Sequence, residues 1–113
     1  MARVILGHRA SGKTTELINR ANEIHRYGET AIVISTNSER SSEWYHSHGL
    51  IAEIPVLSYR QYSLNRPGNP QYDNAHLFID DIVYFLEGLL NNRLEGITID
   101  LEDCMILLRG DRL

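Results

Sequence analysis

The chain has 113 residues, of which 42% are hydrophobic and 23% are charged, the composition of an ordinary globular domain and not of a disordered or fibrous chain. Its formal net charge is −4 at pH 7, so it lacks the basic field of a dedicated duplex-DNA-binding protein, and nucleic acid stays open but unsupported as a partner. A chain of this length supports one hydrophobic core, and we expect a single domain over residues 1–113.

The apolar runs and the cysteine content indicate a compartment. The longest unbroken apolar run, residues 82–86, is far shorter than the ~20 residues that a membrane-spanning helix needs, and residues 4–6 are too few for a secretory signal. The single cysteine, Cys104, excludes an intramolecular disulfide and a zinc finger, and we interpret it as a small core residue. We therefore expect a cytoplasmic protein with no membrane partner.

The hydrophobic pattern of the first third predicts a βαβ unit. Residues 4–6 form an aliphatic run that ends at Gly7, which is typical of a buried parallel strand. From Lys13 onward apolar side chains recur with helical period as far as Gly28, which predicts a helix with a glycine after its last turn. Residues 31–34 are a second apolar β-branched run and predict the second strand.

The remaining chain continues this alternation less regularly. The pattern predicts a helix from Ser38 over residues 38–48, an edge strand at 51–57 and a turn-rich loop at 65–74. It then predicts a buried strand at 77–79, a helix from Ile82 and one or two closing strands at 97–99 and 105–108. We therefore expect an α/β three-layer fold with a mainly parallel sheet of about five strands and the first strand at its centre.

Residues 7–14, Gly-His-Arg-Ala-Ser-Gly-Lys-Thr, match G-x-x-x-x-G-K-[ST] at every fixed position, which is the Walker A motif or P-loop. In such a loop the glycines let backbone N–H groups face phosphate oxygens, the lysine reaches the β- and γ-phosphates, and the last hydroxyl ligates Mg²⁺. A chance match is the alternative, but the predicted strand before the loop and helix after it favour the motif. The expected nucleotide-binding residues are Gly7, Ala10, Ser11, Gly12, Lys13, Thr14 and Thr15, with Thr14 also on the metal and Lys13 also catalytic.

Two acidic residues follow the predicted strand at 77–79, at the end of a parallel sheet where ligands bind. Asp80 has the place of a Walker B aspartate, which holds the Mg²⁺ shell, and Asp81 that of a base that orients or deprotonates the attacking water. Alternatively, both residues simply cap the helix that follows, since acids are favoured at a helix N-terminus. The two interpretations are compatible.

The two motifs also carry a family resemblance. Residues 7–19 resemble the P-loop of RecA-like NTPases, residues 11–18 are similar to the thymidine kinase version, and residues 79–81 and 96–99 correspond to that family's acidic pair and next core strand. Residues 31–38 and 55–62 are similar to segments of superfamily 1 helicase motor domains. The kinase resemblance implies a zinc-bound cysteine lobe, which a single cysteine cannot form, and the helicase resemblance implies a second RecA-like lobe.

We therefore expect a minimal P-loop NTPase that binds Mg²⁺ and a nucleoside triphosphate, ATP before others, and hydrolyses it slowly. A nucleoside kinase-like phosphotransferase and a nucleotide-responsive adaptor that does not hydrolyse remain as alternatives. Arg109 and Arg112 are candidate arginine fingers toward a neighbouring subunit, so a homo-oligomer or a protein partner is expected to stimulate turnover, although solvated tail arginines are commoner.

The remaining polar and aromatic residues allow two interpretations each. His8 and Arg9 are either phosphate contacts or plain exposed loop residues, and His46 and His48 lack the neighbouring ligands of a metal site. A set of aromatic residues forms either a stacking surface for a base or ordinary core and rim packing: Trp44, Tyr45, Tyr59, Tyr62 and Tyr72.

Overall fold

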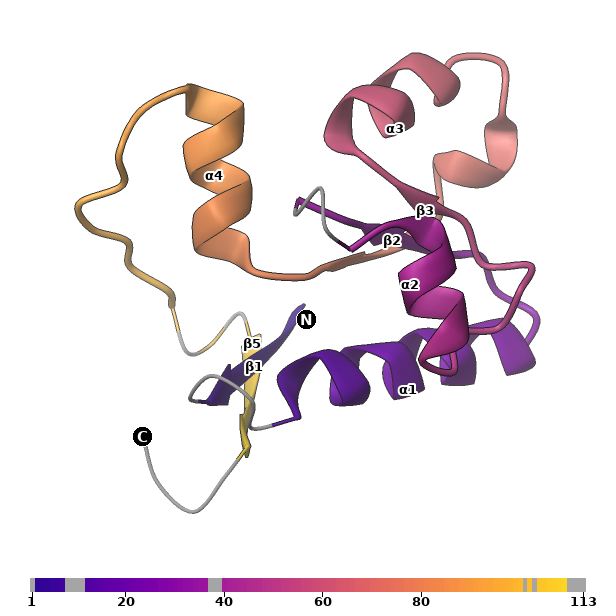
Figure 1. The fold of residues 1–113 in the computed structure, drawn as a ribbon, viewed down its shortest axis with the longest axis horizontal. Helices are drawn as coiled ribbons and strands as arrows, with labels where there is room; N and C mark the ends of the chain where they lie inside the picture. The colour runs from indigo at the N-terminus through magenta and orange to yellow at the C-terminus, as the bar shows by residue number, and fades with distance from the viewer. Residues whose placement is uncertain (1, 8–11, 37–39, 101, 103, 110–113) are drawn as a thin grey trace.

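The computed structural model describes residues 2–7, 12–36, 40–100, 102 and 104–109 as an α/β fold with parallel strands (Figure 1). The elements follow in the order β1 (Ala2–Gly7), α1 (Lys13–Arg26), β2 (Ala31–Ile34), α2 (Ser42–Ser47), β3 (Val56–Leu57), α3 (Tyr59–Asn65), the 3₁₀ turn η1 (Pro70–Tyr72), β4 (His76–Ile79), α4 (Ile82–Leu90) and β5 (Cys104–Arg109). The expected α/β class and the parallel strand direction are confirmed.

The strands form two sheets instead of the one sheet of about five strands that we expected. β2 lies between β3 and β4 in a three-stranded sheet, and β1 pairs with β5 in a two-stranded sheet. The predicted central position of the first strand is therefore wrong, because β5 is its one strand partner within the described residues. An apolar run predicts that a strand forms, but the strand with which it pairs depends on contacts between residues far apart in the sequence, which no local pattern contains.

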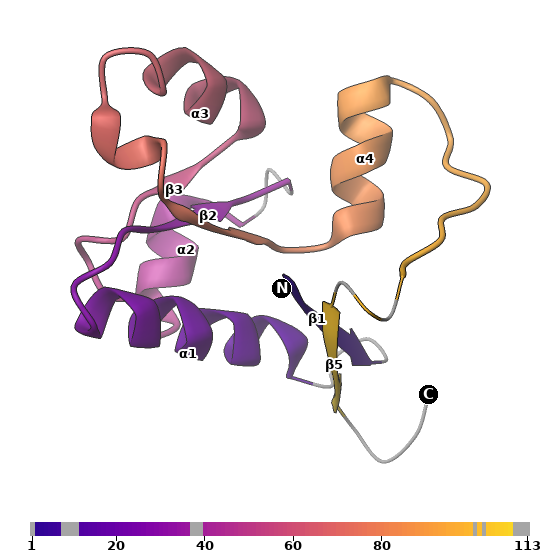
Figure 2. The ribbon, with the colours of Figure 1, turned by 180° about the vertical axis from the view of Figure 1, so that it is seen from behind.

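Helix α1 and strand β2 build the core. All four residues of β2 are buried, and Leu17, Ile18 and Ala21 of α1 pack into the same cluster. Ile5 of β1 also packs against this cluster, so α1 is in contact with both sheets. Figures 1 and 2 show α1 and α2 on one side of the three-stranded sheet, with α3 on the other and the start of α1 beside β1.

One buried polar residue joins α1 to the segment after α2. The Asn22 side chain donates from Nδ2 to the Gly49 carbonyl at 2.8 Å and accepts the Ile51 N–H at 2.9 Å. Both amide ends are thereby satisfied inside the core, where an unpaired amide would cost about 1–3 kcal/mol. This contact fixes α2 relative to α1.

The middle of the chain departs from the predicted boundaries. The helix expected over residues 38–48 is the shorter α2, capped by Ser41, and Ser38 lies outside the described residues. The strand expected at 51–57 is reduced to β3, because residues 51–54 form a turn in which the Ile54 N–H donates to the Ile51 carbonyl at 3.0 Å.

The strand before the acidic pair is present but less buried than predicted. Leu77 of β4 is 43% exposed, because its side chain projects from a face of the sheet that is not fully covered there. The predicted helix from Ile82 is α4, which stands to one side of the three-stranded sheet (Figure 1) and leaves several apolar side chains exposed. Residues 97–99 form no strand, and β5 is the closing strand, with Cys104 buried as expected.

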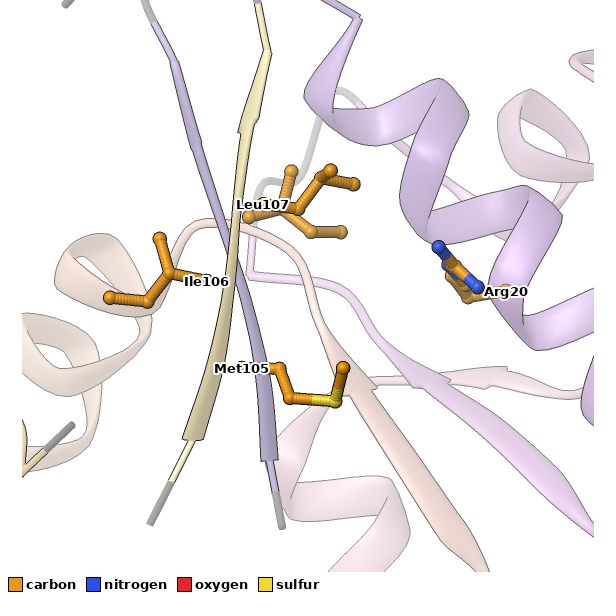
Figure 3. Close-up of a pocket in the computed structure, with 5 residues that line it drawn as sticks. Arg20, Met105, Ile106 and Leu107 are labelled. Carbon is orange, nitrogen blue, oxygen red and sulfur yellow. The ribbon is translucent and has the colours of Figure 1, made fainter. Parts of the chain in front are cut away.

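A small apolar hollow of about 120 Å³ lies between β5 and α1 (Figure 3). Met105 and Leu107 point toward the α1 side, where Arg20 lies, whereas Ile106 points to the opposite face of the strand, as alternation along a strand requires. Ile5 completes the lining. Arg20 is the one polar side chain of the lining, and it is paired with Glu16 and Glu23, so the hollow offers a phosphate no free donor and the candidate site must be sought elsewhere.

Candidate functional site

The described part of the glycine loop consists of its two glycines, one on each side of residues 8–11. Gly7 ends β1, and Gly12 immediately precedes α1 with φ 91° and ψ 16°, a left-handed conformation that favours glycine. Lys13, Thr14 and Thr15 then form the first turn of α1. The remaining loop candidates lie outside the described residues: His8, Arg9, Ala10 and Ser11.

The structure brings Thr14 and Asp80 together. The Thr14 hydroxyl donates to the Asp80 carboxylate, with Oγ1 3.1 Å from Oδ1 and 3.3 Å from Oδ2. Asp80 follows the last residue of β4, and its N–H donates to the Ile34 carbonyl at the end of β2, 3.4 Å away. The first turn of α1 and the carboxyl ends of β2 and β4 therefore meet at this pair of residues.

Arg40 is a third member of this cluster. Its Nη1 donates to Thr14 Oγ1 at 2.8 Å and to Asp80 Oδ2 at 2.9 Å. The guanidinium also lies over the Trp44 ring, with 4.6 Å between Cζ and the ring centroid. The Arg40 side chain is 38% exposed, whereas that of Asp80 is 12% exposed, so the carboxylate faces inward and the guanidinium borders solvent.

Tyr45 completes the shell of Asp80 from the buried side. Its hydroxyl donates to Asp80 Oδ2 at 2.7 Å, and the side chain is fully buried. Burial, together with the neighbouring carboxylate, raises the pKa of Tyr45 well above its ordinary value. The phenol therefore stays protonated and remains a donor to Asp80 throughout the physiological pH range.

Hydrogen bonds between short polar side chains and the backbone hold the segments that carry Arg40, Tyr45 and Asp80. The Ser35 hydroxyl donates to the Arg40 carbonyl at 2.8 Å, and the Ser41 side chain accepts the Trp44 N–H at 3.3 Å and so caps α2. The Thr36 hydroxyl donates to the Asp80 carbonyl at 3.2 Å. Short polar side chains at the end of β2 thus position both the arginine and the aspartate.

The Thr14–Asp80 pair fits the requirements of Mg²⁺. This ion takes oxygen ligands in octahedral geometry at about 2.1 Å, and protein sites supply one or two of them while water and phosphate supply the others. Neighbouring ligands of such an octahedron are about 2.9 Å apart, close to the 3.1 Å between Thr14 Oγ1 and Asp80 Oδ1. No cluster of three or more His, Cys, Asp or Glu side chains that could hold a metal by itself exists among the described residues.

Asp81 caps α4. Its side chain accepts the Tyr84 N–H at 3.2 Å through Oδ1, which is the helix-capping role that the sequence left open. Its φ of 65° is unusual for a residue other than glycine, although aspartate is among the residues that tolerate it. Asp81 is exposed, directly next to the Thr14–Asp80–Arg40–Tyr45 cluster along the chain.

The candidate arginine fingers have a different setting from the tail that we expected. Arg109 is the last residue of β5, and its backbone pairs with Gly7, where the glycine loop begins. Arg112 lies outside the described residues. The register therefore places the Arg109 backbone beside Gly7 of its own chain. The apolar pattern predicts the end of the last strand at residue 108, one residue earlier.

The other aromatic and histidine candidates make packing contacts. Tyr62 stacks on Tyr72, with 6.1 Å between ring centroids, and Tyr59 packs against Phe85. His46 and His48 contact backbone carbonyls through Nδ1, at 3.2 Å and 2.7 Å. Core and rim packing is thus confirmed for Tyr45, and the five aromatic residues do not form one stacking surface.

Arg40 and the role of Tyr45 were missed by sequence reasoning. Arg40 lies in a stretch with poor periodicity, and nothing in its neighbourhood marks it as a ligand. The sequence feature that could have indicated this region is the set of polar residues directly after the apolar residues of β2, at the same edge of the sheet as Asp80. The partnership of a buried tyrosine with an aspartate 35 positions away has no local signature.

Comparison with known proteins found no match among family models, curated proteins or solved structures. Within the residues that the structure describes, no helix is both long and apolar enough to cross a membrane.

Proposed function

We propose that this protein binds a Mg²⁺–nucleoside triphosphate, ATP before others, at the Thr14–Asp80 cluster and hydrolyses it slowly. The observation that carries the proposal is the 3.1 Å contact between Thr14, two residues after the left-handed Gly12, and Asp80, at the carboxyl end of β4. Residues 66 positions apart in the sequence thus meet where a P-loop and a Walker B strand would bring them together.

In this proposal the chain's own residues divide the work. Lys13 and the backbone N–H groups of the glycine loop bind the phosphates, while Thr14 and Asp80 hold Mg²⁺. When bound, Mg²⁺ neutralises charge on the β- and γ-phosphates. Asp81 orients the attacking water and accepts its proton. The proposal also implies a P-loop core of the RecA-like kind, for which the order β1, glycine loop, α1 and the parallel direction of the strands are the supporting features, although β1 and β2 lie in different sheets.

Lys13→Ala tests the proposal directly. The lysine is the only one in the chain and stands at the first position of α1, half-buried. Its removal takes away the cation for the β- and γ-phosphates but no buried core side chain, so the folded variant should lose measurable MgATP binding by calorimetry. Arg26→Ala, at the far end of the same helix, is the matched control and should bind as the wild type does. Unchanged affinity in a folded Lys13→Ala protein contradicts the proposal.

ADP formation and phosphate release, both measured with and without added nucleoside, separate the enzymatic alternatives. Slow release from MgATP alone supports hydrolysis. Transfer that requires the nucleoside identifies a phosphotransferase. Tight binding with no turnover under either condition identifies a nucleotide-responsive adaptor.

A further inference from the structure

We infer that Arg40 is an internal cation that binds the Thr14 hydroxyl and the Asp80 carboxylate in competition with Mg²⁺, and that it gives up these two partners when the metal–nucleotide complex binds. This inference rests on the proposed function, and it adds a control element to the same site.

The geometry shows which atoms the two cations share. Arg40 Nη1 lies 2.8 Å from Thr14 Oγ1 and 2.9 Å from Asp80 Oδ2, and these two oxygens are 3.3 Å apart. The guanidinium nitrogen thus bridges the same hydroxyl and carboxylate that are proposed to hold Mg²⁺. A divalent ion bound there needs the same lone pairs and repels the guanidinium, so the two occupations exclude one another.

The setting of Arg40 allows the exchange. Its backbone is anchored through the hydrogen bond from Ser35, so the residue stays beside the site, while its partly exposed side chain has solvent next to it. Asp80 keeps two other donors when the guanidinium leaves, the Thr14 and Tyr45 hydroxyls. The carboxylate is therefore not left unpaired at any stage, and the exchange costs no unsatisfied buried charge.

An internal competitor lowers the apparent affinity for the external ligand by the fraction of molecules in which the site is free. A partly exposed ion pair is worth little, so the effect is modest: we expect Arg40→Met to bind Mg²⁺–ATP about five- to tenfold more tightly than the wild type. The same substitution should not tighten the binding of metal-free ATP measured in EDTA, because only the metal competes for Thr14 and Asp80.

The experiment compares wild type, Arg40→Met and Arg66→Met by calorimetry with a non-hydrolysable Mg²⁺–ATP analogue and with the same analogue in EDTA. Arg66 pairs with Asp73 at 3.3 Å in the segment after α3, so it supplies a matched loss of an exposed arginine–aspartate pair. Trp44 is the only tryptophan and lies under the Arg40 guanidinium, so its emission gives a second readout in the unmodified protein. The emission of the wild type should change on binding the Mg²⁺ complex, and that of Arg40→Met should change much less.

Each outcome decides the matter. Weaker binding by Arg40→Met makes Arg40 a phosphate ligand and overturns the exchange, as does equal affinity in wild type and variant. Tighter binding that persists in EDTA also overturns it, because the metal is then not the competitor. If neither wild type nor Arg40→Met binds the Mg²⁺ complex, the proposed function itself fails, which is a different result from equal, measurable binding.

Discussion

Asp80 is the residue on which the candidate site depends most. Three side chains donate to its carboxylate, and they come from the first turn of α1, from the segment before α2 and from α2 itself. Because hydrogen bonds to a charged group contribute about 1.5–3 kcal/mol each, this carboxylate links three segments as well as serving as a proposed metal ligand. A substitution at Asp80 should therefore affect both folding and binding.

Asp80→Asn and Asp81→Asn should have different effects. Asp80→Asn replaces a carboxylate oxygen with an NH₂ group that faces other donors, so we expect Mg²⁺–ATP affinity to fall on the order of ten- to a hundredfold by calorimetry. Asparagine tolerates positive φ and caps helices as aspartate does, so Asp81→Asn should keep the fold and the affinity. Its phosphate release should be slower, since the amide accepts no proton.

The separation of roles at the acidic pair would be contradicted by two results. One is equal loss of affinity in both variants. The other is a turnover rate of Asp81→Asn equal to that of the wild type, which would leave Asp81 with its helix-capping role alone.

At the residue scale, the sequence identified candidate site residues wherever a chemical role requires a fixed spacing of residue types. The glycine–lysine–threonine string identified Thr14, and the position directly after an apolar run identified Asp80. The contact between these two side chains was therefore predictable from two local patterns. Arg40 was not, because its function arises only when the end of β2 lies beside β4. A contact of that kind is produced by folding and leaves no trace in the neighbouring residues.

At the scale of elements, the serine caps of the short helices α2 and α3 can be tested for their contribution to stability and to binding. α2 has only six residues and begins at Ser42, so its cap contributes a large share of its local stability. Ser41 accepts the Trp44 N–H, and Ser58 caps α3 in a reciprocal arrangement with Gln61. The two serines are thus equivalent caps on helices with different relations to the site.

We expect Ser41→Ala and Ser58→Ala each to lower the free energy of unfolding by about 1 kcal/mol in chemical denaturation. Only Ser41→Ala should alter Trp44 emission and Mg²⁺–ATP affinity, because α2 carries Trp44 and Tyr45 next to the Asp80 carboxylate. An equal effect of both substitutions on affinity would show that general destabilisation, and not the placement of α2, is responsible.

Elements with strong periodicity were predicted with nearly correct boundaries, as the 14 residues of α1 and the four of β2 show. The weak elements were not. β3 has two residues, which is less than one alternation of a strand, and no hydrophobic pattern distinguishes it from the turn before it. Burial was overestimated at β4, because an apolar run does not state whether a helix will cover it.

At the scale of the whole molecule, the register of β1 with β5 leads to a prediction about how Arg109 affects the rate of turnover. The Arg109 backbone pairs with Gly7 of the same chain. We therefore expect a stimulating arginine at this position to act within one molecule. We expect Arg109→Ala to slow phosphate release, with a rate per chain that does not depend on protein concentration. Efficient P-loop enzymes gain a factor of about 10³–10⁵ from such a group, so even partial loss is measurable.

A mixing experiment separates action within the chain from action between chains. Inactive Lys13→Ala chains that retain Arg109 are added in excess to Arg109→Ala chains. Restored turnover would contradict action within one chain and would support the subunit-bridging arginine that the sequence first suggested.

The pairing of β1 with β5 also determines the order in which the molecule can be completed during synthesis. The buried cluster draws its members from residues 17–54, so the ribosome has released all of it long before Cys104 is made. Ala2 pairs with Cys104 across roughly a hundred positions, so β1 can find its partner only after the residues of the core have been made. The core of residues 17–54 can thus form while β1, the strand that leads into the glycine loop, is still unpaired. The strand that leads into the glycine loop should then take its final place as a late and separate event, after the core is already formed.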